Sequence, residues 1–180
     1  MEASNDFLKI AITSPASIPN EAERISRLLS TGEVDFVHIR KPSWTQEEIS
    51  ELIESIPSRF HSRLKLHDYY NLIYDFKVGG IHVNFRNRNL DLPKSIPEIS
   101  KSAHSISELN DFENYDYIFL SPIFDSISKK DYKSGFNLDE LSSIICGKRI
   151  IALGGVTPNN FALLKEKGFY GAAMLGHFWN

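Results

Sequence analysis

Two apolar runs near the carboxyl end decide the fold: Arg149-Ile-Ile-Ala-Leu-Gly-Gly-Val-Thr-Pro158 and Gly171-Ala-Ala-Met-Leu-Gly176. Neither run alternates with polar residues, which is typical of a parallel strand covered on both faces. Both reach glycine, which lets the backbone approach a ligand closely. Thr157 and Pro158 then predict the start of a helix, whose N–H groups favour an anion. The two runs therefore predict neighbouring strands with a phosphate site at their carboxyl ends.

Strand and helix patterns alternate along the rest of the chain. Short apolar runs predict six earlier strands, over residues 7–13, 34–40, 64–67, 81–83, 99–104 and 117–120. Helical spacing predicts helices over residues 19–29, 45–56, 70–76, 105–112, 138–145 and 159–167. This alternation indicates a parallel sheet wound by right-handed crossovers.

Eight predicted strands favour an α/β fold, a compact (β/α)8 TIM barrel, over the alternative of a doubly wound open sheet. Such barrels typically have about 250 residues. A chain of 180 residues is therefore expected to have short helices, with the final helix missing or clipped. The segment 84–97 is polar and contains prolines, so the helix after the fourth strand is expected to be vestigial. The length suits one core, so we expect a single domain over residues 1–180.

The composition excludes several classes of partner. The net charge is -3 and the chain has no basic tract, so nothing indicates binding to nucleic acid or to an anionic membrane surface. No apolar run approaches the roughly 18 residues of a membrane span, and the polar start is not a signal peptide. The single cysteine, Cys146, fits a reducing compartment, and its apolar neighbours predict a buried thiol. We expect a cytoplasmic protein.

Polar side chains gather where the predicted strands end, which is where barrels carry their function. They are His38, Arg40, His67, Asp68, His82, Asn84, Ser102 and His104. Strand alternation puts His38 and Arg40 on one face, and Ser102 and His104 on one face. Any one of these histidines would be unremarkable as a hydrogen-bonded structural residue, but the cluster indicates chemistry. His38 and His104 are the candidates for acid-base work near neutral pH.

Cationic and hydroxyl side chains could hold a phosphate or diphosphate. Arg40 and Lys129 would make charge-assisted hydrogen bonds, with Ser126 and Ser128 as further donors. Asp68 is the candidate ligand for Mg²⁺, which proteins usually hold with one or two carboxylates plus substrate phosphates. The sequence offers no evident second carboxylate.

These residues resemble the thiamine phosphate synthase and TenI-like thiazole tautomerase superfamily over nearly the whole chain. The similar motifs are Asp35-Phe-Val-His-Ile-Arg40, Leu66-His-Asp68, Gly79-Gly-Ile-His-Val83, Lys101-Ser-Ala-His-Ser105, Ser121-Pro-Ile-Phe-Asp-Ser-Ile-Ser-Lys129 and Ile151-Ala-Leu-Gly-Gly-Val-Thr-Pro158. The resemblance implies a thiamine-pathway barrel that binds hydroxyethylthiazole phosphate. Its phosphate would lie at Gly154, Gly155, Leu175 and Gly176.

The synthase branch of this family joins the thiazole phosphate to a pyrimidine diphosphate with the help of Mg²⁺. It implies that Arg40, Lys129, Ser102 and His67 hold the diphosphate, and that Asp68 holds the metal. Three departures stand against that branch: His38 replaces a pyrimidine-binding glutamine, Pro42 a diphosphate-binding lysine and Asn87 the second metal-binding aspartate. Lys41 is the nearest substitute for the lost lysine, but its side chain should point to the other face.

His38 and His104 are instead similar to the tautomerase branch. Our first interpretation is therefore a TenI-like isomerase that moves a proton on a thiazole phosphate carboxylate, with His104 as general acid-base, His38 assisting and no metal. The alternative is a thiamine phosphate synthase that uses Mg²⁺ at Asp68, with Asn87 as a weak second ligand. A non-catalytic binder of thiazole phosphate is a second alternative. A missing final helix would expose apolar surface beside the last strand, which predicts a homo-oligomer.

Overall fold

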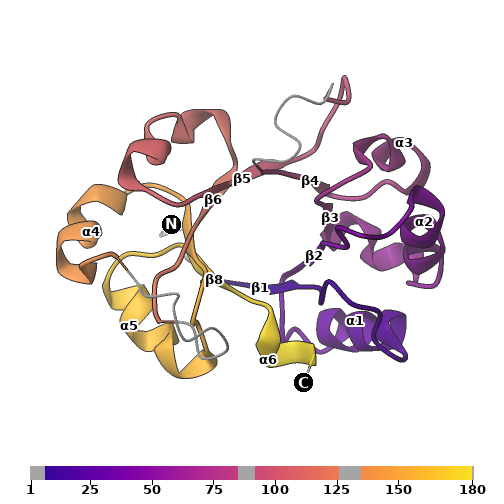
Figure 1. The fold of residues 1–180 in the computed structure, drawn as a ribbon, viewed down its shortest axis with the longest axis horizontal. Helices are drawn as coiled ribbons and strands as arrows, with labels where there is room; N and C mark the ends of the chain where they lie inside the picture. The colour runs from indigo at the N-terminus through magenta and orange to yellow at the C-terminus, as the bar shows by residue number, and fades with distance from the viewer. Residues whose placement is uncertain (1–6, 85–91, 126–134, 180) are drawn as a thin grey trace, which may run out of the picture. The chain divides into compact units, whose positions relative to one another are not determined.

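The structure is a computed structural model that describes residues 7–84, 92–125 and 135–179 (Figure 1). Its eight strands are β1 (Leu8–Ile12), β2 (Phe36–Ile39), β3 (Leu64–Leu66), β4 (Gly80–Val83), β5 (Ile99–Ala103), β6 (Tyr117–Leu120), β7 (Ile150–Ala152) and β8 (Gly171–Met174). They follow chain order in a closed barrel, and the pairings between them are parallel. The predicted barrel is confirmed, and the open sheet is excluded.

The helices between the strands are short, as the length of the chain predicts. The α-helices are α1 (Glu21–Ser30), α2 (Gln46–Glu54), α3 (Ile73–Phe76), α4 (Leu138–Ile145), α5 (Phe161–Glu166) and α6 (Gly176–Trp179). The 3-10 turns are η1 (Ser58–Arg63), η2 (Tyr70–Leu72), η3 (Ile106–Leu109), η4 (Phe112–Asn114) and η5 (Pro158–Asn160). Within the described ranges, none of these helices has the length and apolar character needed to cross a membrane.

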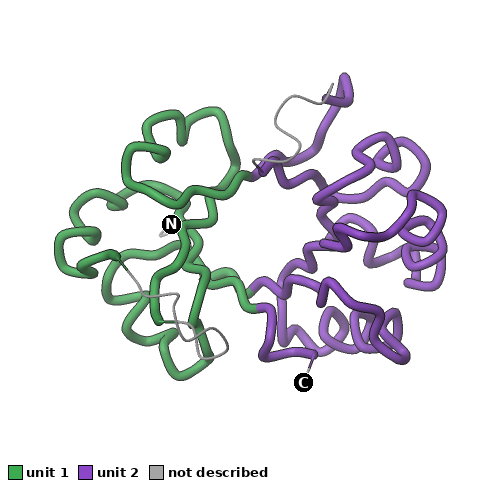
Figure 2. Tube along the Cα trace, in the orientation of Figure 1, with its two compact units in different colours: residues 1–9, 101–174 green, residues 10–100, 175–180 purple. Residues whose placement is uncertain are grey.

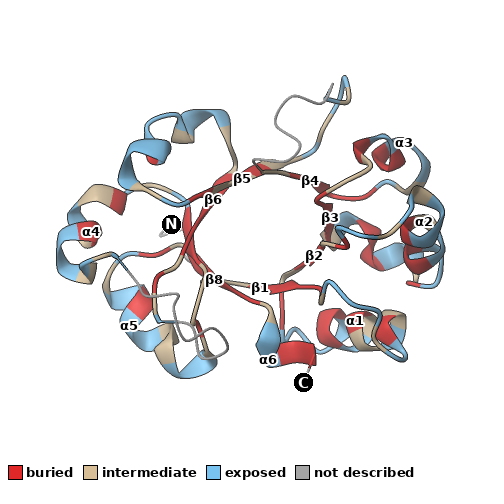
Figure 3. Ribbon diagram, in the orientation of Figure 1, coloured by how far each residue is buried: buried red, intermediate tan, exposed pale blue. Residues whose placement is uncertain are grey.

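Helix α2 shows how the local sequence sets an element. The Thr45 side chain accepts the Glu48 N–H at 3.3 Å, and the Glu48 carboxylate accepts the Thr45 N–H at 2.7 Å. This reciprocal capping box satisfies two backbone donors that the first turn would leave unpaired. Ile49, Leu52 and Ile53 share the buried face of the helix. Figure 3 shows the same pattern elsewhere, with mainly buried strands and helices that are buried on one side only.

Two predictions about local structure are wrong. Residues 105–112 do not form an α-helix but contribute to η3 and η4. Lys101 Nζ donates to the Glu108 carbonyl oxygen at 2.7 Å, and the Glu108 carboxylate accepts the His104 N–H at 3.0 Å, so this segment is held by local side-chain contacts. Cys146 is exposed rather than buried, because α4 ends at Ile145 and a turn follows.

The final helix is clipped to the single turn α6. Phe178 and Trp179 are buried, and Trp179 Nε1 donates to the carbonyl oxygen of Ile12 at 2.6 Å. This turn buries apolar side chains of its own against β1, which weakens the reason for which we predicted self-association. The homo-oligomer stays a prediction.

The chain consists of two compact units (Figure 2). One unit contains residues 1–9 and 101–174 and carries the pairings of β6 with β7 and of β7 with β8. The other contains residues 10–100 and 175–180 and carries the pairings among β1, β2, β3 and β4. The single domain over residues 1–180 stays a prediction.

Candidate functional site

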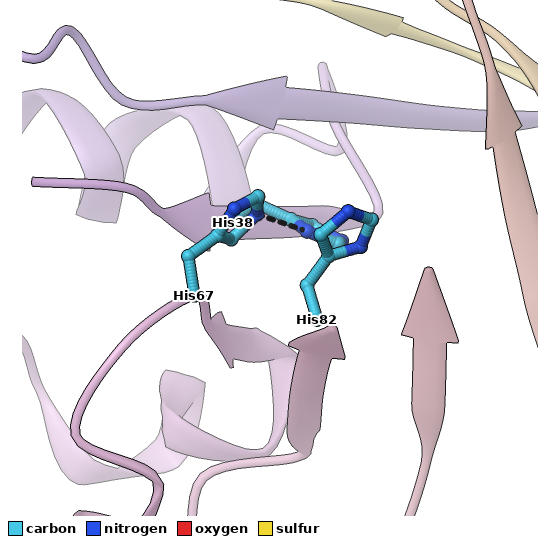
Figure 4. A group of neighbouring side chains, drawn as sticks. All are labelled: His38, His67 and His82. Atoms are coloured by element: carbon cyan, nitrogen blue, oxygen red, sulfur yellow. Dashed lines mark hydrogen bonds between the residues drawn. The ribbon is translucent and has the colours of Figure 1, made fainter. Parts of the chain in front are cut away.

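Three histidines come together at the carboxyl ends of β2, β3 and β4 (Figure 4). The strand register explains why. His38 pairs with Lys65, and Leu66 pairs with Ile81, so His67 lies beside His82 one step further along. Residues paired across a sheet, and residues two apart on one strand, point to the same face. The three imidazoles therefore point to one side of the sheet, and we call them the histidine cluster.

The rings of the histidine cluster are in direct contact. His38 Nδ1 and His67 Nε2 are 3.0 Å apart and share a hydrogen bond. The rings of His67 and His82 stack, with centroids 4.3 Å apart, and the His38 ring meets each of them edge-on at 5.2 Å. All three side chains are buried. His82 Nδ1 lies 2.8 Å from Ser100 Oγ, which contacts the carbonyl oxygen of Ile81.

The surroundings keep His38 and His82 uncharged. Burial, with smaller contributions from His82 and Lys65, lowers the pKa of His38 well below its ordinary value. Burial and the nearby Arg40 lower the pKa of His82 to about 3. Because desolvation penalises the charged imidazolium, both rings are neutral at neutral pH. Lys65 brings one buried cation to the same face and is held by Glu98 and by the carbonyl oxygen of Gly79.

Arg40 and Asp68 follow the cluster at the ends of β2 and β3. Arg40 is half-buried, and its backbone N–H donates to Thr13 Oγ1 at 2.8 Å. Asp68 is half-buried and lines a pocket of about 560 Å³. The other lining residues are Lys41, Pro42, Trp44, Tyr69, Tyr70 and Asn71. A carboxylate at such a pocket suits a hard cation bound together with phosphate oxygens.

Lys41 does not replace the lysine that Pro42 displaces. Its ammonium group donates to Glu21 Oε2 at 2.6 Å and to the carbonyl oxygen of Ala16 at 2.7 Å. The side chain is fully buried and lies over the Trp44 ring. Its charge is therefore committed to the protein interior.

In the other unit, His104 is exposed at the end of β5 and contacts the end of β6. Its Nδ1 lies 3.2 Å from both the carbonyl oxygen and the hydroxyl of Ser121. An Nδ1–H that donates to the carbonyl oxygen leaves Nε2 as the proton acceptor of the ring. Ser102 is half-buried on the same strand, two residues earlier. His104 is thus held in an orientation suited to proton transfer.

The glycine pair after β7 is required by close backbone packing. Gly154 and Gly155 have positive φ angles of 88° and 65°. A Cβ atom on Gly155 would lie 2.5 Å from the Asp125 carbonyl oxygen, and one on Gly154 would lie 2.8 Å from Pro122 Cα. The loop after β6 therefore packs on these glycines. Next to them, Thr157 begins η5 as predicted, in a capping box with Asn160.

The remaining predicted residues form two groups. Leu175, half-buried, and Gly176, exposed, follow β8 and belong to the same unit as the histidine cluster. Asn87, Ser126, Ser128 and Lys129 lie outside the described residues. The sequence predicted that His38 and His67 lie at strand ends, and the register of β2 and β3 brings the two rings into contact. His82 was also predicted at a strand end, but Lys65 and Ser100 were not among the predicted site residues.

The closed parallel barrel places this chain among the (β/α)8 barrel proteins. Enzymes of this class have their active sites at the carboxyl ends of the strands, where the titratable side chains of this chain also lie. Within this class, a family model described as thiamine monophosphate synthase matches residues 10–178. The chain belongs to the thiamine monophosphate synthase family.

Known relatives are consistent with this family. A protein named thiamine-phosphate synthase from Prochlorococcus marinus (strain AS9601) is 25% identical over 171 residues, which cover 89% of this chain and 48% of that protein. A second one, from Desulfitobacterium hafniense (strain DSM 10664 / DCB-2), is 23% identical over 155 residues, covering 80% and 75%. The chain thus spans about half the length of the first relative and three quarters of the second.

Solved structures agree in fold. The crystal structure of thiamine phosphate pyrophosphorylase from Bacteroides thetaiotaomicron superposes with a TM-score of 0.82 at 32% identity, covering 97% of this chain and 85% of that one. The pyrophosphorylase from Pyrococcus furiosus gives a TM-score of 0.74 at 18% identity, which supports the fold alone. The names of these relatives favour the synthase alternative over our first interpretation, the tautomerase.

Proposed function

We propose that this protein is a thiamine phosphate synthase, which couples hydroxyethylthiazole phosphate to hydroxymethylpyrimidine diphosphate and releases pyrophosphate. The observation that carries the proposal is the 32% identical pyrophosphorylase structure, which covers nearly the whole chain. The relatives named thiamine-phosphate synthase support it over 80–89% of the chain. The motifs alone favoured a tautomerase over a synthase, and the named relatives favour the synthase.

The state of His38 also supports the synthase. The tautomerase interpretation needs His38 to assist proton transfer, but its ring is fully buried and hydrogen-bonded to His67. Its lowered pKa keeps it neutral far below physiological pH. A general acid-base works best when its pKa lies near the working pH. His38 is therefore better suited to contact a neutral heterocycle than to move a proton.

The binding roles rest on the resemblance of each residue to the family motif. Arg40, Ser102 and Lys129 would hold the diphosphate, with Ser126 and Ser128 as further donors. His67 already shares Nε2 with His38, so its own contact with the diphosphate would use Nδ1. The thiazole phosphate would bind at Gly154 and Gly155, and at Leu175 and Gly176. Backbone N–H groups at such glycines donate to phosphate oxygens without a side chain in the way.

The residues present are compatible with Mg²⁺. Asp68 offers one half-buried carboxylate at a pocket of mixed polar and aromatic lining, and Mg²⁺ in proteins usually takes one or two carboxylates and completes its shell with phosphate oxygens and water. Asn87 would add at most an amide oxygen. When bound, Mg²⁺ neutralises charge on a leaving diphosphate. Arg40 then adds a fixed positive charge from the end of β2.

The test is a coupling assay on the purified protein with both substrates, with and without Mg²⁺. We expect thiamine phosphate and pyrophosphate in equal amounts, detected by mass spectrometry and only when Mg²⁺ is present. Asp68→Asn should abolish most of the product, whereas Asp75→Asn, on the exposed side of α3, should not. Product formation that is unaffected by EDTA or by Asp68→Asn would contradict the assigned metal ligand.

A second candidate, the TenI-like tautomerase, is favoured by one observation: His104 is exposed and oriented by Ser121. The same assay separates the candidates when the thiazole phosphate carboxylate is supplied alone. Tautomer conversion that survives EDTA and disappears in His104→Gln, without any coupling activity, would support the tautomerase. Binding of thiazole phosphate with no turnover of either kind would leave the non-catalytic binder.

A further inference from the structure

The histidine cluster has a role that neither candidate reaction requires. Its ligand atoms, one from each of His38, His67 and His82, all lie within 4.8 Å of one another. Across the part of the chain that the structure describes, it is the one group of three or more His, Cys, Asp or Glu residues close enough to share an ion. We propose that these three residues bind a divalent transition metal ion, with Zn²⁺ as the expected ion.

The donor chemistry selects the class of metal. Imidazole nitrogens suit Zn²⁺ and its neighbours in the first transition row, whereas Mg²⁺ prefers oxygen ligands. Three protein ligands fill three corners of a tetrahedron and leave the fourth to water or to a small ligand, as in catalytic zinc sites. The site is therefore distinct from the proposed Mg²⁺ position at Asp68.

The geometry is close to what such an ion needs. Zinc–nitrogen bonds of about 2.0–2.1 Å in a tetrahedron place the nitrogen atoms about 3.3 Å apart. His38 Nδ1 and His67 Nε2 are already 3.0 Å apart. The widest separation in the cluster must close by at most about 1.5 Å. Rotation of a stacked ring about χ2, which is a broad torsion in histidine, supplies a movement of that size.

A hydrogen bond between His82 Nδ1 and Ser100 Oγ orients the His82 ring. The Ser100 hydroxyl has one hydrogen, and its contact with the carbonyl oxygen of Ile81 uses that hydrogen. When the Ser100 hydroxyl donates to Ile81, Ser100 Oγ accepts the Nδ1–H of His82 and Nε2 carries the lone pair. Metal-binding histidines are almost always oriented by such an outer partner. Ser100 thus acts as a positioning residue for the site.

The charges around the cluster are mostly compensated. Lys65, one step lower on the same face, is paired with Glu98 and is not an isolated cation. Arg40 lies half-buried at the end of β2 and opposes a bound dication, whereas Asp68 follows His67 directly in the chain and favours it.

The first test is titration of the metal-free protein with Co²⁺ as a visible probe, and with Zn²⁺ by calorimetry. We expect one ion per chain and the strong visible absorption of tetrahedral Co²⁺. His38→Gln, His67→Gln and His82→Gln should each remove this absorption. Ser100→Ala should weaken binding by about 10–100-fold, the usual effect of losing an outer partner. His177→Gln, an exposed histidine in the same unit, is the matched control and should bind normally.

A second test needs no substitution, so it holds even if the glutamine variants fail to fold. Imidazole ¹⁵N resonances report which ring nitrogen is protonated or bound to metal. Zn²⁺ should shift the signals of His38, His67 and His82 and leave those of the other three histidines in place. Absence of saturable binding, or shifts confined to other histidines, would overturn the proposal. Neither readout uses substrate, so the outcome is independent of which reaction the protein catalyses.

Discussion

Lys41 and Glu21 form an ion pair that is almost completely removed from water. The two side chains are 0% and 4% exposed, and their charged atoms are 2.6 Å apart. Glu21 Oε1 has no hydrogen-bond partner within the described part of the chain. A buried pair of this kind adds little net stability, but the loss of one partner leaves an uncompensated charge in the interior.

Lys41→Met should therefore be strongly destabilising. The methionine keeps the apolar volume but leaves the Glu21 carboxylate without its cation, so we expect the free energy of unfolding to fall by about 3–5 kcal/mol. Urea unfolding measures the change. Lys94→Met, at an exposed lysine, should remain within about 0.5 kcal/mol of the parent protein. Equal stability of the two variants would show that the pair is not structurally important.

Glu21 should also give a recognisable pH dependence. Burial raises its folded-state pKa above the ordinary value of 4.5, although Lys41 donates to the carboxylate. The folded chain therefore retains a proton that the unfolded chain has released, and the free energy of unfolding falls as pH rises above 4.5 through the folded pKa. Glu21→Gln should lack this component. Unfolding midpoints of the two proteins, compared from about pH 4 to about pH 7, should diverge; parallel curves would contradict the prediction.

Single residues also show how much of the candidate site could be predicted from the sequence. His38, His67 and His82 were recognised because each is a polar residue at the end of a short apolar run. The contact of His82 with His67 depends on which residues of β3 and β4 are paired, and that register is a property of the folded sheet. The burial of Lys65 was also not predicted, because a lysine side chain is almost never fully buried unless it is paired. Glu98, its partner, lies 33 positions away in the chain.

At the scale of elements, α4 and the segment 105–112 give opposite results. Residues 138–145 form a helix with the predicted bounds because Asn137 accepts from the N–H groups of Asp139 and Glu140. Residues 105–112 have apolar side chains at helical spacing too, but contacts from Lys101 and to His104 hold η3 in place of an α-helix. A capping residue next to a helix, such as Asn137, can be recognised in the sequence. The hydrogen bond from Lys101 of β5 to the Glu108 carbonyl oxygen depends on the folded structure and cannot be recognised in the same way.

The glycine loop after β7 permits a test by substitution. Gly155→Ala places a methyl group against the Asp125 carbonyl oxygen and imposes a positive φ. We expect a loss of about 1–2 kcal/mol from the backbone and about 1–3 kcal/mol from overpacking. Gly168→Ala, at a φ of 85° with nothing within 4 Å of the new atom, should show only the first loss. Unfolding in urea separates the two variants.

If the loop binds the thiazole phosphate as proposed, Gly155→Ala should also raise KM for that substrate, because the displaced loop no longer presents its N–H groups. Gly168→Ala should leave KM unchanged. A Gly155→Ala protein with normal KM would separate the packing role of this glycine from phosphate binding.

At the scale of the whole molecule, the barrel was predictable because eight apolar runs alternate with helical patterns along the chain. That regularity is carried by local periodicity, which a single sequence displays directly. The division into two compact units was not predictable, since each unit joins segments that are distant in sequence. The sequence predicted that the final helix is missing or clipped, but it did not predict the turn α6. Four residues are too few to show a helical periodicity.

The α6 turn should control the assembly state. Removing residues 175–180 would strip Phe178 and Trp179 from the protein and expose apolar residues that they cover. We expect the truncated chain to form larger assemblies than the full chain in light scattering. Trp179→Phe is the control, because it keeps an apolar ring but removes the hydrogen bond to the Ile12 carbonyl oxygen. We expect this variant to lose about 1–3 kcal/mol of stability and to assemble as the full chain does. Identical light scattering from the truncated and full chains would be evidence against this function of α6.

The strand register that aligns the histidines also limits how this family can change length during evolution. One residue inserted between Gly80 and His82 would reverse the alternation of β4 and turn the imidazole toward the helices. The same insertion in η1, before β3 begins, leaves the alternation unaltered. Gains and losses of residues among relatives that keep these three imidazoles should therefore accumulate in the connections and avoid the short strands altogether.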